Sequence, residues 1–151
     1  MAERRPTLSS GLSYQDPRAA LAWLQEALGF EVVMLLEDDK GAIAHAEMRL
    51  GDSTIMVGGE WSPSHRSPKS LGGKNTQAIH VQIETDLDAH FERAKAAGGE
   101  VFAEPQTQFY GDRTYRVRDP EGHIWTVART VKVVTREEAE TLTGLKITGW
   151  T

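Results

Sequence analysis

The 151-residue sequence contains no cysteine. This absence excludes disulfides, thiolate zinc sites, iron–sulfur clusters and cysteine nucleophiles, so any metal would have to be bound by histidine and carboxylate side chains. Long apolar runs are also missing, since no segment approaches the roughly 20 residues of a membrane-spanning helix. The charged N-terminus is not followed by the apolar segment of a secretory signal. We therefore expect a cytoplasmic protein with no membrane partner.

The sequence also lacks a cluster of lysine and arginine. Its formal net charge is −5, and proteins that bind nucleic acid usually carry a basic patch, so we expect no nucleic-acid partner. Hydrophobic residues make up 39% of the chain and charged residues 26%, which excludes a low-complexity or disordered chain. A chain of this length forms one domain, or two small modules that share a core.

The clearest positive signal is a weak internal repeat. Asp16 precedes a proline and a helical pattern of apolar residues that stops at Gly29, as expected for an N-cap and a glycine C-cap. Asp86 begins a second pattern of this kind, which stops at Gly98. A β-rich run restarts after each glycine. The repeat predicts two modules with the same order of elements.

The spacing within the two copies agrees as well. Asp16 lies 40 residues before Met56, and Asp86 lies 40 residues before Thr126. Each copy predicts a strand, a helix and three further strands, hence an α+β fold of tandem βαβββ modules. The predicted strands cover 8–14, 31–36, 41–50, 53–58, 77–84, 100–103, 113–118 and 123–129.

These elements divide the chain into a domain and an extension. We expect a single domain over residues 1–130, with module one at 7–61, a polar linker at 62–75 and module two at 76–130. Residues 131–151 form a C-terminal extension, in which the capping box from Thr135 to Glu138 predicts a short helix near residues 135–143.

Three motifs connect the repeat to a known family. They are Asp-x-x-Ala after the first strand, Leu-Gly-Phe after the first helix, and Asp-Pro-Glu-Gly-His before the last strand. With them the sequence resembles the glyoxalase, bleomycin-resistance and extradiol-dioxygenase superfamily, also called vicinal oxygen chelate, over roughly residues 7–130. Residues 110–123 are similar to its bacterial glyoxalase-like or bleomycin-resistance-like subgroup. The resemblance implies curved sheets around a cup and a homodimer.

The resemblance also implies a metal site, which this sequence does not reproduce. Family enzymes hold one divalent metal with ligands, usually histidine and glutamate, on the first and last strand of each module. At our best register these positions are Ser9, Met56, Ala78 and Thr126. A thioether, two hydroxyls and a methyl group do not hold such a metal. We therefore expect no metal and no cofactor at these positions.

The leading prediction is a metal-free small-molecule binding protein of the bleomycin-resistance or glyoxalase-like type, with its ligand in an apolar cup. His80 is the candidate catalytic residue, because an imidazole among apolar walls can orient a ligand or move a proton. The predicted ligand-binding residues are Met56, Trp61, His80, Tyr110, Arg116 and Thr126. Two other histidines, His65 in the linker and His90 on the second helix, are expected at the surface.

Two alternatives remain. The first is a metal-dependent lyase, isomerase or dioxygenase with an atypical site built from His45, Glu47 and His80, of which the first two share one face of a strand. The second is a structural or partner-binding protein that uses the C-terminal tail. The sequence also leaves open whether the modules pair within one chain or between two chains.

Overall fold

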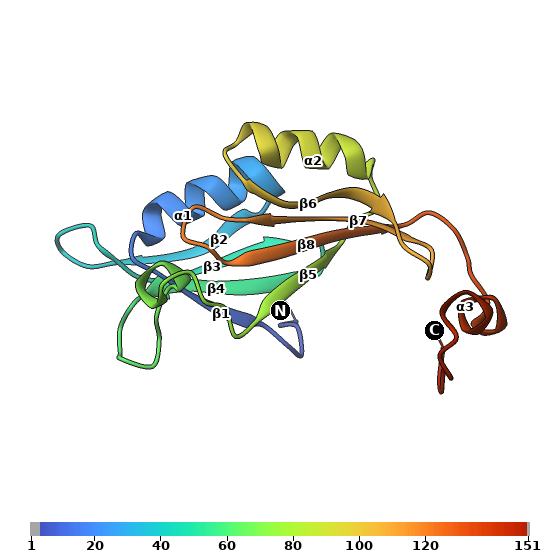
Figure 1. Cartoon of the computed structure of the whole chain (residues 1–151). Helices are drawn as coiled ribbons and strands as arrows, with labels where there is room; N and C mark the ends of the chain where they lie inside the picture. The colour runs from blue at the N-terminus through green and yellow to red at the C-terminus, as the bar shows by residue number, and fades with distance from the viewer. Residues whose placement is uncertain (1–3, 151) are drawn as a thin grey trace.

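The computed structural model describes residues 4–150 (Figure 1). Its first module contains β1 (Ser10–Tyr14), α1 (Pro17–Trp23) with the short π-helical segment η1 (Leu24–Leu28), β2 (Glu31–Glu37), β3 (Ile43–Leu50) and β4 (Ser53–Gly59). Its second contains β5 (Ala78–Gln82), α2 (Leu87–Ala96), β6 (Glu100–Thr107), β7 (Asp112–Arg118) and β8 (Ile124–Thr130). The linker carries the 3₁₀ turn η2 (Pro68–Leu71), and the extension carries α3 (Arg136–Thr143).

Each module forms one mixed four-stranded sheet. The strand orders are β1-β4-β3-β2 and β5-β8-β7-β6. In both sheets the first and last strands of the module run parallel, and the remaining neighbours run antiparallel. This confirms the predicted α+β fold of two βαβββ modules.

Several predicted strand ends differ from the observed ones by one or two residues, and the end of β6 differs by four. β1 begins at Ser10 rather than at Leu8, whose side chain is exposed. β6 continues to Thr107 instead of ending at Ala103, although it contains Pro105. The ladder between β6 and β7 is irregular around this proline, so its missing N–H leaves no regular ladder hydrogen bond unmade.

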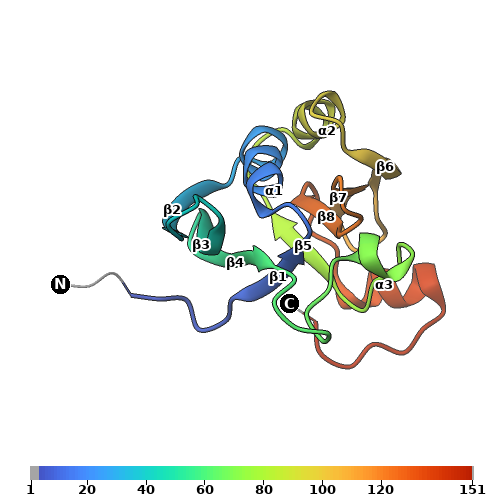
Figure 2. The ribbon, with the colours of Figure 1, turned by 90° about the vertical axis from the view of Figure 1, so that its left-hand side faces the viewer.

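The helices α1 and α2 lie side by side on one face of the two sheets (Figures 1 and 2). One shared core lies beneath them, because alternate strand residues and the apolar helix faces of both modules point to the same interior. The rings of Phe30 in module one and Trp125 in module two pack edge to face, with their centroids 5.6 Å apart, so the core is continuous across the modules. The core includes the side chains of Tyr14, Trp23, Leu24, Met48, Phe91, Tyr115, Val117 and Trp125.

A buried polar cluster also joins the modules. The Tyr14 hydroxyl donates to Asp119 Oδ2 at 2.6 Å, and Trp125 Nε1–H donates to the same oxygen at 3.1 Å. Burial, with the Asp119 carboxylate, raises the pKa of Tyr14 well above its ordinary value, so the phenol stays a neutral donor. Hydrogen bonds to a charged acceptor are the stronger kind, and this one crosses the module boundary.

A second carboxylate fixes the start of α1. The backbone N–H groups of Gln15 and Asp16 donate to Glu121 Oε1 and Oε2 at 2.6 and 3.0 Å. The Asp-Pro-Glu-Gly-His turn of module two therefore holds the segment that begins the helix of module one.

The extension leaves β8 along the β6–β7 turn. The N–H groups of Val131 and Lys132 both donate to the carbonyl oxygen of Gly111 at 3.0 Å. The predicted capping box is present, because Thr135 and Glu138 bond each other's backbone N–H. The helix α3 lies beyond the end of the second sheet, toward the side that α1 and α2 do not cover (Figure 1).

Candidate functional site

The face of the second sheet opposite the helices carries one cross-strand row from three strands. His80 on β5 lies beside Thr126 on β8, and Thr126 lies beside Arg116 on β7. The Nε–H of Arg116 donates to Thr126 Oγ1 at 3.2 Å, which orients the guanidinium. The side chains of Arg116 and His80 are exposed, and within residues 4–150 neither forms an ion pair. We call these three residues the Arg116 row.

A chain of hydrogen bonds leads from this row to the end of the sheet. The Gln82 amide faces His80 Nε2 at 3.3 Å through Oε1 and donates to Thr130 Oγ1 at 3.0 Å through Nε2. The Thr130 hydroxyl then donates to Asp112 Oδ1 at 2.7 Å. Because an amide oxygen only accepts, the His80 tautomer that suits this contact carries its proton on Nε2 and has Nδ1 as an acceptor.

The corresponding face of the first sheet has a cross-strand row of its own. Gly11, Met56 and Glu47 are cross-strand neighbours on β1, β4 and β3, and Met56 is half-buried. Ser9 bonds the Thr54 hydroxyl at 2.9 Å. Ser9 and Met56, two of the predicted metal-ligand positions, carry a hydroxyl and a thioether.

The alternative metal site is only partly assembled. Glu47 is 8% exposed and lies 3.4 Å from His45 Nε2 and 3.2 Å from an Arg5 nitrogen. Across residues 4–150, however, no three His, Cys, Asp or Glu side chains are grouped closely enough to hold a metal ion. The structure thus pairs His45 with Glu47 and leaves His80 outside that pair, bonded to Gln82.

The two predicted aromatic ligand contacts lie in different places. Trp61 stands at the start of the linker, 73% exposed, with its ring stacked on that of His65 at 3.8 Å. Tyr110 lies in the β6–β7 turn, with its ring perpendicular to that of Phe109 at 5.1 Å.

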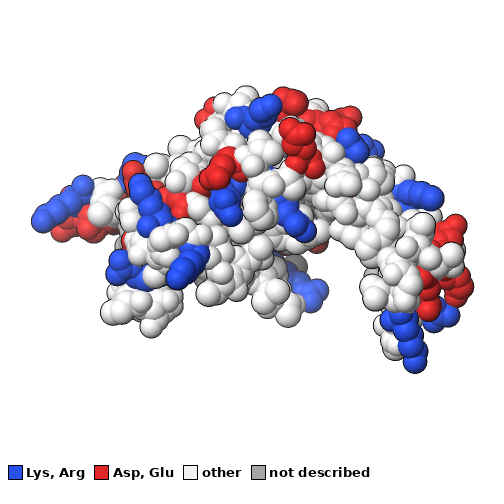
Figure 3. Space-filling view, viewed as in Figure 1, with Lys and Arg blue, Asp and Glu red and all other residues white. Residues whose placement is uncertain are grey.

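Tyr110 borders a hollow of about 850 Å³ between the second sheet and the extension. We call it the extension hollow, and in the space-filling view it opens under the arch that the extension forms with the body (Figure 3). Trp150 also lines this hollow, although it was not among the predicted ligand-binding residues. The lining is Gln82, Tyr110, Asp112, Thr130, Lys132, Val133, Val134, Gly149 and Trp150.

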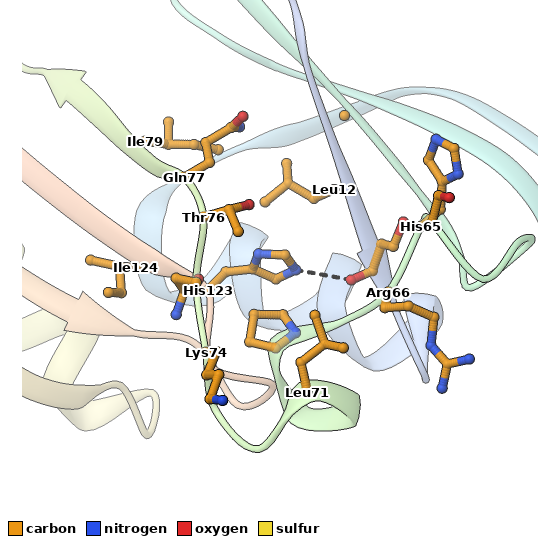
Figure 4. Close-up of a pocket in the computed structure, with 15 residues that line it drawn as sticks. Leu12, His65, Arg66, Leu71, Lys74, Thr76, Gln77, Ile79, His123 and Ile124 are labelled. Carbon is orange, nitrogen blue, oxygen red and sulfur yellow. Dashed lines mark hydrogen bonds between the residues drawn. The ribbon is translucent and has the colours of Figure 1, made fainter.

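A smaller pocket of about 170 Å³ lies at the seam between β1, β5 and the linker (Figure 4). His123 lies in it and donates from Nε2–H to the carbonyl oxygen of Ser13 at 2.9 Å. Leu12, Ile79 and Leu71 supply apolar walls. A pocket of this size holds only a few heavy atoms, so it does not extend the Arg116 row into a larger site.

The surface prediction for His90 was wrong. Its Nε2–H donates to the carbonyl oxygen of Leu28 at 3.3 Å, and its Nδ1 accepts from the Tyr115 hydroxyl at 2.5 Å. Burial lowers the pKa of His90, and the nearby Arg93 charge lowers it further. The helical pattern could not reveal this role, because it depends on packing α2 against η1 of the other module.

The fold and this site belong to one class of protein. The profile of the Glyoxalase/Bleomycin resistance protein/Dioxygenase superfamily matches residues 9–127, so the chain belongs to that superfamily. No helix within residues 4–150 is both long and apolar enough to cross a membrane.

Individual relatives add detail. An uncharacterized protein of Mycobacterium tuberculosis (strain ATCC 25618 / H37Rv) is 31% identical over 139 residues, which cover 89% of this chain and 81% of the relative. The crystal structure of TioX from Micromonospora sp. ML1 is also 31% identical, with a TM-score of 0.64, over 82% of this chain and 98% of TioX. A superfamily member from Nocardioides, 14% identical with a TM-score of 0.59 over 90% of each chain, shares the fold.

Proposed function

We propose that the protein is a metal-free small-molecule binding protein that holds an anionic ligand on the Arg116 row. The orientation of Arg116 is the observation that carries the proposal. Its guanidinium is exposed, and among residues 4–150 it is bonded to Thr126 through Nε, which leaves its other N–H donors turned to solvent and able to bond a ligand. A guanidinium bonds a carboxylate or phosphate through two parallel hydrogen bonds.

The neighbouring groups suit this role. His80 lies two strands from Arg116 in the same row, and its Nδ1 can accept from a ligand donor. Met56 offers a polarizable apolar surface on the adjacent sheet, as expected for a ligand site with apolar walls and few polar groups. The hydroxyl, thioether and methyl groups at the four family metal positions favour binding without a metal.

Arg116→Ala tests the proposal. In a thermal-shift panel of small aromatic and aliphatic acids with their neutral amides, we expect the acids alone to raise the Tm. Loss of a charged hydrogen-bond pair is worth about 1.5–3 kcal/mol, so the variant should bind these acids about ten- to a hundredfold more weakly. Arg129→Ala is the matched control, since alternation places Arg129 on the opposite face of β8.

Three results would contradict the proposal. They are a panel in which no acid raises the Tm, equal binding of acids and amides, and unchanged acid binding by Arg116→Ala. Stoichiometric, tightly held metal in protein purified without chelators would instead favour the alternative of a metal-dependent lyase, isomerase or dioxygenase.

We also propose that the chain forms a homodimer. The outer strands β2 and β6 support this, because both expose apolar side chains, among them Leu36 and Phe102, each about half exposed. Exposed apolar edge strands are usually covered by another chain. Partner binding through the C-terminal tail stays an alternative prediction.

A further inference from the structure

We infer that the C-terminal extension forms part of the ligand site, and that Trp150 and Tyr110 select ligands carrying a planar aromatic ring next to the anionic group. This inference rests on the proposed function. In this inference the extension hollow binds the aromatic ring of the ligand, and the Arg116 row binds the anionic group of the same ligand.

Trp150 is fixed in place although it is the second-last residue of the chain. Its Nε1–H donates to the carbonyl oxygen of Val134 at 2.8 Å, and its side chain is 37% exposed. The bond uses the polar edge of the indole. Part of its apolar ring surface is left facing the hollow, of which Trp150 is a lining residue.

Tyr110 supplies a second fixed ring. It is 38% exposed and packs edge-to-face against Phe109, while it also lines the hollow. Val133, which is 87% exposed, adds an apolar wall. Rigid aromatic surfaces lose little entropy when a flat ring packs on them, and a hollow of about 850 Å³ has room for a bicyclic ring.

The hollow and the Arg116 row are adjacent. Gln82 lines the hollow, and it lies two residues beyond His80 on β5, a distance of about 7 Å along a strand. Arg116 lies four residues from Asp112 on β7, about 13 Å along the strand, so one small molecule reaches both when the long guanidinium side chain extends toward the hollow. Its charge belongs at the Arg116 end, because Asp112 lies at the hollow end with one carboxylate oxygen bonded to Thr130.

Part of the hollow's lining lies outside the region matched by the family. The family match ends at residue 127, so Trp150 and Val133 lie beyond it, whereas Tyr110 lies within it. The selectivity we infer therefore combines residues of this chain's extension with a turn inside the family region.

The test compares two acids of the same charge and similar size. Isothermal titration with 2-naphthoate and its saturated analogue decahydro-2-naphthoate measures the preference for a flat ring in the full-length chain. We expect the native protein to bind 2-naphthoate about tenfold more tightly. Trp150→Ala and Tyr110→Ala should remove most of this preference, and Trp150→Phe should keep it. Leu145→Ala, an exposed apolar change in the same extension, should leave it unchanged.

The outcomes separate this inference from the proposed function. Suppose that Trp150→Ala and Tyr110→Ala keep the preference for 2-naphthoate, while Arg116→Ala lowers the affinity for both acids. The extension is then not part of the site, and the proposed function stands. If Arg116→Ala leaves both affinities unchanged, the proposed function and the inference that rests on it are both wrong. Failure of both acids to bind the native protein at millimolar concentration overturns both as well.

Discussion

Both ring nitrogens of His90 are already bonded inside the protein. Nε2–H donates to Leu28 and Nδ1 accepts from Tyr115, so a second proton on Nδ1 would break the bond from the tyrosine hydroxyl. Arg93, one turn away on α2, faces the same region and opposes the added charge. His90 therefore acts as a neutral bridge between modules, and acid should weaken it.

The sign of the pH effect follows from linkage. The pKa of His90 is lower in the folded protein than its usual value of about 6.5. Below pH 6.5 the unfolded chain therefore binds more protons at this site, and the contribution of His90 to stability is lost as pH falls through the folded pKa. We expect the free energy of unfolding in urea to drop less between pH 7.5 and 5.5 in His90→Gln than in the native protein.

The exposed linker histidine provides the control. His65→Gln should keep the pH dependence of the native protein, because His65 lies at the surface. Equal pH dependence in the native protein and His90→Gln would show that His90 is not the bridge described above.

At the residue scale, strand alternation is enough to place His80 and Gln82 on one face of β5. The position of Trp150 could not be predicted, because it depends on a hydrogen bond to Val134 within a segment that has no periodic pattern. Side-chain periodicity encodes a residue's face; it does not encode which distant segment will cover that face.

Among the elements, the β6–β7 turn determines where the extension goes. Gly111 has φ +99°, and a Cβ on it would collide with the carbonyl oxygen of Lys132. Both extension N–H groups that follow β8 bond the Gly111 carbonyl. Only glycine permits both the backbone angle and this close approach.

Gly111→Ala should therefore displace the extension. We expect it to lower the free energy of unfolding by at least about 2 kcal/mol, measured in urea, and to lower the fluorescence anisotropy of Trp150 in a variant whose other tryptophans are phenylalanine. Gly41→Ala is the matched control, because Gly41 has φ +79° and a Cβ on it would have no atom within 4 Å. Gly41→Ala should lower the free energy of unfolding only by the backbone strain, about 1 kcal/mol. Equal effects of the two changes would contradict a docking role for Gly111.

The sequence predicted the elements well where their ends carry local signals. Asp16, Asp86 and Thr135 each cap a helix as expected, because capping depends on neighbouring residues. The strand β6 was predicted too short, because its length is set by pairing with β7 rather than by its own composition.

At the scale of the whole molecule, the modules share so much that neither is an independent unit. The core is continuous, Tyr14 bonds Asp119 across the boundary, and the Arg93 guanidinium donates to the carbonyls of Gln25 and Glu26. The repeat in the sequence predicted two modules. It could not predict how tightly they are joined, since these contacts connect residues that differ between the copies.

We therefore expect a single cooperative unfolding transition. Variants that retain only Trp23, in module one, or only Trp125, in module two, should report the same urea midpoint. Glu121→Ala removes the acceptors of two backbone N–H groups and should lower the free energy of unfolding by about 2–3 kcal/mol without separating the two midpoints. Distinct midpoints in the native background would contradict this coupling.

The parallel pairing of the first and last strand in each module has a consequence for the order of folding. Ser10 lies beside Ile55, and Ala78 lies beside Ile124, so each sheet closes only after most of its module has left the ribosome. Contacts between residues so far apart in sequence slow folding. During synthesis, β1 stays unpaired until its partner β4 has been made, whereas β2, β3 and β4 pair as sequence neighbours in a meander. The segment that begins α1 gains the acceptor Glu121 only once module two has been made.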